Sequence, residues 1–135
     1  MIFLLDTNAI SDFVRGHPRF DFYFDRLSAD DRVSTCVVVR GESLYGIERM
    51  PQGRRRSALE AATTAALAGL PCYAIPAAAG DQYSRIKYSC ERKGSRLDEN
   101  DLWIAATAIT LVATLVTLDV DFKNVDGLII EDWTT

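Results

Sequence analysis

The stretch MIFLLDTNAIS, residues 1–11, decides the fold, because a short apolar run ends abruptly at polar side chains. Residues 2–5 are apolar without alternation, which predicts a strand buried on both faces of a covered sheet. Asp6 is the first polar side chain at the carboxyl end of that strand. Ligands of open α/β sheets bind at this end, so Asp6 is a candidate for chemistry, although an aspartate there also caps helices.

Strands and helices alternate along the rest of the chain. Apolar runs predict further strands at residues 33–36, 72–75, 114–117 and 128–130. Helical spacing with Gly and Pro stop signals predicts helices at residues 8–15, 18–27, 38–50, 54–67, 77–92 and 102–111. This order predicts an α/β fold with a mostly parallel central sheet of about five short strands and helices on both faces.

The length of 135 residues predicts a single domain spanning residues 1–135. A hydrophobic content of 48% and a charged content of 25% are typical of a globular protein. The longest mostly apolar stretch, residues 102–118, is broken by threonines, so no membrane span is predicted. No basic leader followed by an apolar core opens the chain, and we therefore expect a cytoplasmic protein.

The formal net charge of −4 argues against bulk electrostatic binding of nucleic acid. It does not exclude a phosphate substrate, because bound cations would cancel the charge of gathered carboxylates. The three cysteines are odd in number and far apart, which predicts small buried thiols. His17, expected in a surface loop, is the only histidine, so a two-histidine ribonuclease and a Cys–His pair are excluded.

Four acidic side chains share a position near the end of a predicted strand. Asp6 ends the first strand, and Glu42 lies in the first turns of the helix after the second. Asp101 opens an apolar helix in DENDLWIAATAI, and Asp119 follows the fourth strand in TLVTLDVDF, with Asp121 two residues later. Because these ends of parallel strands face one edge of the sheet, carboxylates distant in sequence can converge there.

If these carboxylates converge, their mutual repulsion predicts a bound cation. Two carboxylates about 4 Å apart repel by roughly 4 kcal/mol at an effective dielectric constant of 20. Ligation by oxygen alone suits Mg²⁺ or Mn²⁺, which can also activate water near neutral pH without a histidine. Taken singly, each acid has a structural explanation. Asp6 could be a helix cap, and Asp98 and Asp101 could form a capping arrangement. Glu42 could pair with Arg49 or another base on its helix surface, and Asp119 and Asp121 could be turn residues.

Four stretches together resemble the PIN-domain ribonucleases and, within them, the VapC-type toxins of bacterial toxin–antitoxin pairs. They are LLDTNAIS, RGESLYGIERM, NDLWIAATAI and TLVTLDVDF, in this order and at the usual separations. The resemblance runs nearly end to end and implies a PIN-like three-layer α/β/α fold. It also implies an endoribonuclease dependent on Mg²⁺ or Mn²⁺, which forms a homodimer and is silenced by a small antitoxin in its active-site groove.

The resemblance assigns roles to individual positions. Asp6, Glu42, Asp101 and Asp119 match the acidic quartet that binds the metal, with Asp121 as the alternative to Asp119. Thr7, Asn8 and Thr117 match orienting polar groups, and Asp98, in a segment RLDEN that departs from many relatives, is either a further acid or a cap. The side chains expected to guide the RNA backbone are Arg40, Arg49, Arg54, Arg55 and Arg56.

Two rival functions fit less of the sequence. A phosphatase with Asp6 as the nucleophile would want an acid two residues later, where this chain has Asn8, and a lysine near the phosphate, yet no lysine precedes Lys87. A non-catalytic module would use its acids only to hold a structural ion or a basic partner. The complete quartet argues against this second rival.

Overall fold

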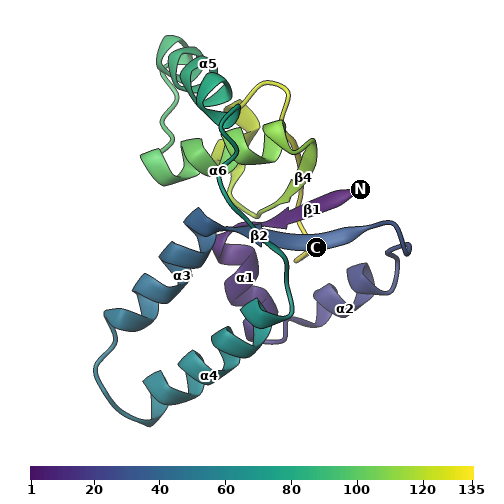
Figure 1. Cartoon of the computed structure of the whole chain (residues 1–135), viewed down its shortest axis with the longest axis vertical. Coiled ribbons are helices and arrows are strands. Elements are labelled where there is room, and N and C mark those ends of the chain that lie inside the picture. Colours follow the sequence, from purple (N-terminus) through teal and green to yellow (C-terminus); the bar gives the residue numbers. More distant parts are fainter.

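The computed structural model covers residues 1–135 and contains five strands, six α-helices and one 3₁₀-helix (Figure 1). Along the chain these are β1 (Ile2–Leu5), α1 (Thr7–Val14), α2 (Pro18–Phe24), β2 (Arg32–Cys36), α3 (Val37–Glu48), α4 (Arg54–Ala68), β3 (Cys72–Tyr73), α5 (Ala79–Lys93), α6 (Glu99–Thr110), β4 (Ala113–Val116), η1 (Val120–Asn124) and β5 (Ile129–Glu131). The predicted alternation of strands and helices is confirmed.

The five strands form one sheet in the order β3-β2-β1-β4-β5. All four strand pairs are parallel, and β1 lies at the centre, with Phe3 opposite Val33 of β2 and Thr114 of β4. Leu4 and Leu5 are fully buried, as a strand covered on both faces requires. The predicted parallel sheet is therefore confirmed, with every strand parallel.

Helices cover the sheet on two sides, which gives three layers (Figure 1). Helices α1 to α4 lie on one side, where they connect β1 to β2 and β2 to β3. Helices α5 and α6 lie on the other side, in the connection from β3 to β4. The chain therefore leaves β1 into α1 on one face and reaches the adjacent strand β4 from α6 on the other. A switch point of this kind opens a crevice at the carboxyl ends of the two strands.

Two packing features position the elements around this crevice. In α6, Ala105, Ala106 and Ala108 are fully buried, and such small side chains let the helix lie close to the sheet. On the other side, Trp133 from the C-terminal segment is only 1% exposed and sits among aromatic rings. We call this group the aromatic cluster; it comprises Phe3, Phe20, Tyr23, Phe24 and Trp133.

Three local expectations need correction. Helix α6 begins at Glu99, ahead of residue 102, because the Asp98 side chain caps it. Cys72 is exposed, since β3 is a two-residue strand at the edge of the sheet, whereas the other two thiols are buried. His17 caps α2 and is not a free loop residue: its Nδ1 accepts a hydrogen bond from the Arg19 backbone N–H at 3.2 Å. None of the helices combines the length and apolar character needed to cross a membrane.

Candidate active site

Asp6 lies where β1 passes into α1, at the switch point of the sheet. Its Oδ1 accepts a hydrogen bond from the Ala9 backbone N–H at 2.8 Å, so Asp6 is the N-cap of α1. Its own backbone N–H donates to the Val116 carbonyl at 3.1 Å, which ties the residue to the end of β4. Asp6 is only 4% exposed. Asp6 therefore caps α1, as the sequence allowed, and its carboxylate is also buried at the carboxyl end of β1.

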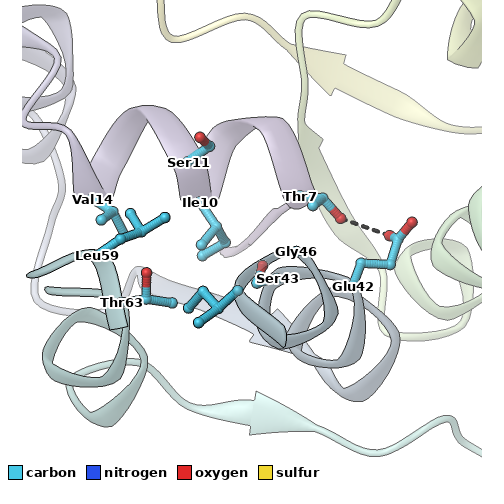
Figure 2. Close-up of a pocket in the computed structure, with 10 residues that line it drawn as sticks. Thr7, Ile10, Ser11, Val14, Glu42, Ser43, Gly46, Leu59 and Thr63 are labelled. Atoms are coloured by element: carbon cyan, nitrogen blue, oxygen red, sulfur yellow. Dashed lines mark hydrogen bonds between the residues drawn. The ribbon is translucent and has the colours of Figure 1, made fainter. Parts of the chain in front are cut away.

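Glu42 projects from α3 and is held between two helices of opposite layers. Its Oε1 accepts a hydrogen bond from the Thr7 hydroxyl at 2.6 Å (Figure 2), and its Oε2 accepts one from the Asn100 side-chain amide at 3.3 Å. The ion pair considered between Glu42 and Arg49 is not formed. The Arg49 guanidinium instead lies over the Tyr45 ring, 5.6 Å from its centroid.

Asp101 stands in the first turn of α6, and Asp98 caps that turn. The Asp98 Oδ1 accepts a hydrogen bond from the Asp101 backbone N–H at 2.8 Å, which leaves the Asp101 carboxylate free of a capping role. Burial raises the pKa of Asp101 to about 7, and the negative charges of Asp98, Glu42, Asp119 and Asp6 add to this rise. The charge of every other acid of the predicted quartet therefore affects the pKa of Asp101.

The pKa of Asp6 is raised for the same reasons. Burial raises it to about 6, opposed by hydrogen bonding to Thr117 and to the Ala9 amide, while the charges of Asp119 and Glu42 raise it further. The Thr117 hydroxyl also accepts a hydrogen bond from the Asp119 backbone N–H at 3.0 Å. It thereby fixes the backbone that carries Asp119 beside the end of β4.

Asp119 and Asp121 differ in their surroundings. Asp119 caps η1, and its Oδ1 accepts a hydrogen bond from the Asp121 backbone N–H at 2.9 Å. The charge of Asp119 is among the main causes that raise the pKa values of Asp6 and Asp101, whereas the exposed Asp121 is not. Asp119 is therefore the acid of this pair that lies close enough to Asp6 and Asp101 to affect their pKa values.

No basic side chain compensates these four carboxylates. The ion pairs of the molecule all lie elsewhere, so Asp6, Glu42, Asp101 and Asp119 have no Lys, Arg or His partner. As the side chains lie, no three acidic, histidine or cysteine groups are arranged to hold a metal ion. The arrangement is a set of mutually repelling oxygen donors, the donor type that Mg²⁺ and Mn²⁺ prefer.

The other predicted site residues are distributed unevenly. Asn8 is exposed, and its side chain makes no hydrogen bond. Arg40 lies in the first turn of α3, at the carboxyl edge of the sheet, whereas the remaining predicted arginines lie toward the α3–α4 connection, away from that edge (Figure 1): Arg49, Arg54, Arg55 and Arg56. Arg56 has a structural contact there, because its Nη1 donates to the Met50 carbonyl at 3.0 Å and its Nη2 pairs with Glu48 at 3.6 Å.

A cavity of about 220 Å³ opens beside Thr7 and Glu42, between α1, α3 and α4 (Figure 2). Its polar end is the Thr7–Glu42 hydrogen bond, and its apolar lining comes from side chains on all three helices. These are Ile10, Val14, Ile47 and Leu59. The acidic crevice is therefore continuous with a mainly apolar hollow on the α1 side of the sheet.

The comparisons with known proteins agree with this geometry. The PIN domain family model matches residues 3–128. The chain belongs to the PIN domain family. Ribonuclease VapC2 of Rickettsia felis is 29% identical over 137 residues, covering 98% of each chain. Ribonuclease VapC5 of Mycobacterium tuberculosis is 31% identical over 103 residues, covering 76% of each.

A solved structure extends the likeness of this PIN domain to three dimensions. The crystal structure of VapBC2 from Rickettsia felis, bound to a DNA fragment from their promoter, superposes with a TM-score of 0.88 at 27% identity. The match covers 98% of this chain and 99% of that one. The resemblance to VapC-type PIN domains and the expected three-layer fold are confirmed.

Sequence reasoning missed one contact of this site, the hydrogen bond from Asn100 to Glu42. Asn100 immediately precedes Asp101 in the motif NDLWIAATAI, so its place beside a predicted acid was visible. The partner was not visible, because the meeting of the first turn of α6 with α3 depends on the packing of two helices from opposite layers.

Proposed function

We propose that this PIN-domain protein is an endoribonuclease dependent on Mg²⁺ or Mn²⁺ and the toxin half of a toxin–antitoxin pair. One observation carries the proposal. Asp6 and Asp101, which are 95 residues apart in the sequence, lie near other carboxylates at one sheet edge, where burial and mutual repulsion raise both pKa values and no basic side chain forms an ion pair with them. The relatives named ribonuclease VapC support RNA as the substrate.

The side chains of the site divide into ligands and groups that hold them. Asp6, Glu42, Asp101 and Asp119 would bind the ion, with Asp121 as the alternative to Asp119. When bound, the ion lowers the pKa of a water molecule and neutralises charge on the phosphodiester. Thr7 holds Glu42, Asp98 caps the turn that carries Asp101, and Thr117 fixes the backbone at Asp119.

Substrate and product follow from the same arrangement. In-line attack of water on phosphorus would leave a 5′-phosphate on one product. Arg40, exposed at the carboxyl edge, is best placed among the predicted arginines to contact the RNA backbone near the acids. Asn8, exposed beside Thr7, stays a proposed orienting group for the incoming phosphate.

The proposed partner is a small antitoxin that occupies the hollow between α1, α3 and α4. The apolar lining of that hollow would accept apolar side chains, and its polar end at Thr7 and Glu42 brings the occupant to the acidic site. The solved VapBC2 structure supports a toxin–antitoxin assembly. We further propose a homodimer and a cytoplasmic location, the first checked by the mass of the purified protein in solution.

Cleavage of RNA by the purified protein tests the proposal. We expect cleavage with Mg²⁺ or Mn²⁺ and none with chelator, and we expect Asp6→Asn and Asp101→Asn each to lower the rate by a factor of about 100 or more, as expected for loss of a metal ligand. Asp30→Asn is the matched control, because Asp30 is exposed just before β2, at the opposite edge of the sheet. Activity that survives the chelator or Asp6→Asn would refute the proposal.

Growth of cells that express the chain alone tests the toxin assignment separately. We expect expression to arrest growth and Asp101→Ala to relieve the arrest, while the circular dichroism spectrum of the purified variant stays that of the native protein. Co-expression of the antitoxin should restore growth to cells carrying the native chain. Arrest that persists with Asp101→Ala would show that toxicity does not come from the acidic site.

A further inference from the structure

We propose that Asn100 is a positioning residue that holds Glu42 in the metal site, an inference that rests on the proposed function. Its amide Nδ2 donates to Glu42 Oε2 at 3.3 Å, while the Thr7 hydroxyl donates to Oε1 at 2.6 Å. Both oxygens of one carboxylate are thus held, one from each side. A glutamate has three rotatable side-chain bonds, and a hydrogen bond on each carboxylate oxygen restricts them more than one bond alone would.

The position of Asn100 in the fold makes this contact a bridge between layers. Thr7 belongs to α1 and Glu42 to α3, on one face of the sheet, whereas Asn100 belongs to α6, on the other (Figure 1). Because Asn100 and Asp101 are consecutive in the first turn of α6, the bridge also sets the position of Glu42 relative to Asp101.

The chemistry of the two donors suits a cation site. A hydroxyl and an amide are neutral donors, so they orient the Glu42 carboxylate without cancelling the negative charge that attracts a divalent ion. A lysine or arginine at position 100 would hold Glu42 equally well but would compete with the ion. An aspartate there would repel Glu42 and provide no donor.

Two cavities meet at this bridge. Glu42 lines both the hollow beside Thr7 and a second hollow of about 320 Å³, which Asn100 and the exposed Val37 and Tyr45 also line. Released from Asn100, the Glu42 side chain would have open space on the α6 side into which it could turn. The hydrogen bond therefore keeps the carboxylate from swinging away from the other acids.

Direct measurement of Mn²⁺ binding to the purified full chain, by titration calorimetry, tests the proposal without relying on RNA cleavage. We expect Asn100→Ala to weaken Mn²⁺ binding about tenfold, within the range known for groups that orient metal ligands. Asn100→Gln keeps an amide donor and should recover most of the loss. The matched control is Gln52→Ala, which removes an exposed amide from the α3–α4 connection and should leave binding within twofold of the native value.

The outcomes separate this inference from the proposed function. If the native chain binds Mn²⁺ and Asp101→Asn abolishes binding, but Asn100→Ala binds within twofold of native, only the positioning role of Asn100 is overturned. If the native chain binds no Mn²⁺, the proposed function and this inference both fail. Thermal unfolding of the metal-free variants completes the test: a large drop in Tm for Asn100→Ala and an equal one for Asn100→Gln would assign Asn100 a structural role and overturn the inference.

Discussion

Two regions of the molecule join segments that are far apart in sequence: the aromatic cluster and the acidic edge, which comprises Asp6, Glu42, Asp101 and Asp119. The contacts of the aromatic cluster stabilise the folded chain, whereas those of the acidic edge destabilise it. In the aromatic cluster, the buried Trp133 contacts rings from β1 and α2, and Tyr23 stacks on it with ring centroids 5.2 Å apart. Each of these contacts removes apolar surface from water and stabilises the fold. At the acidic edge, the contacts are between like charges, and burial raises the pKa of Asp6 and of Asp101.

This difference shows how the protein can maintain a site that is unfavourable without its ligand. The sheet and its aromatic and aliphatic packing fix the ends of β1 and β4, so Asp6 and Asp119 cannot move far apart. The electrostatic cost is then recovered when a divalent ion binds. Removing a side chain from the aromatic cluster should therefore lower stability. Neutralising an acid at the acidic edge should raise the stability of the metal-free protein and weaken metal binding.

The largest effect on stability is expected from Trp133→Ala. The side chain is 1% exposed, and removal of a buried tryptophan costs about 3 to 5 kcal/mol of unfolding free energy. Urea unfolding followed by circular dichroism measures this loss. Trp103→Ala is the control: Trp103 is half-buried and stacks on Tyr83 with centroids 4.1 Å apart, so its loss should cost clearly less. Equal losses would mean that the aromatic cluster is no more important than a surface pair.

Asp6→Asn is expected to raise the free energy of unfolding of the metal-free protein, whereas Trp133→Ala lowers it. The pKa of Asp6 rises from 3.8 to about 6, and at about 1.4 kcal/mol per pKa unit the ionised carboxylate costs the fold up to about 3 kcal/mol above pH 7. Asparagine keeps an oxygen that can cap Ala9, so the variant should be more stable by up to that amount and at the same time lose Mn²⁺ binding. Asp6→Ala, which also loses the cap, should gain about 1 kcal/mol less. A destabilised Asp6→Asn in chelator would contradict the electrostatic account.

The pH dependence of stability should reveal the same cost without any mutation. Asp6 and Asp101 have folded-state pKa values above 3.8, so the folded chain binds more protons than the unfolded chain between about pH 4 and pH 7, and stability falls as pH rises through this window. Solvent screening reduces the contribution of the half-buried Asp101. We expect the metal-free protein to be about 2 to 3 kcal/mol more stable at pH 5 than at pH 8. Urea unfolding at both pH values in chelator measures this, and the Asp6→Asn, Asp101→Asn double variant should show little of it.

The sequence predicts the strands and helices of the fold, and the sheet edge at which the candidate site lies, because these depend on local patterns. Unalternating apolar runs and stop signals gave the strands and helices, and parallel strands necessarily bring Asp6 and Asp119 to the same edge. The alternatives for Asp6 and Asp98 could not be resolved locally, since a cap and a site residue occupy the same position. The structure shows that Asp6 is a cap and also lies near Asp119 and Glu42, whereas Asp98 caps the turn of α6 that carries Asp101.

What the sequence does not show depends on contacts between layers. The Asn100 hydrogen bond to Glu42 requires the relative placement of α3 and α6, which no spacing along the chain encodes. The ion pair considered for Glu42 and Arg49 was reasonable on a lone helix, but Thr7 and Asn100 are nearer partners in the folded chain. Exposure of Cys72 likewise follows from its place in an edge strand, which depends on the order of the strands.

The smallest expected effect comes from backbone strain, at the turn between α6 and β4. Val112 has a φ of +54°, a left-handed conformation that a β-branched residue adopts at a cost of roughly 1 to 2 kcal/mol, and its side chain is 85% exposed, so it contributes little packing. Asparagine tolerates this conformation well. Val112→Asn should therefore stabilise the metal-free and the metal-bound protein equally, by about 1 kcal/mol, whereas Asp6→Asn stabilises only the metal-free form. Urea unfolding with and without Mn²⁺ distinguishes the two, because strain in the backbone is independent of charge at the acidic edge.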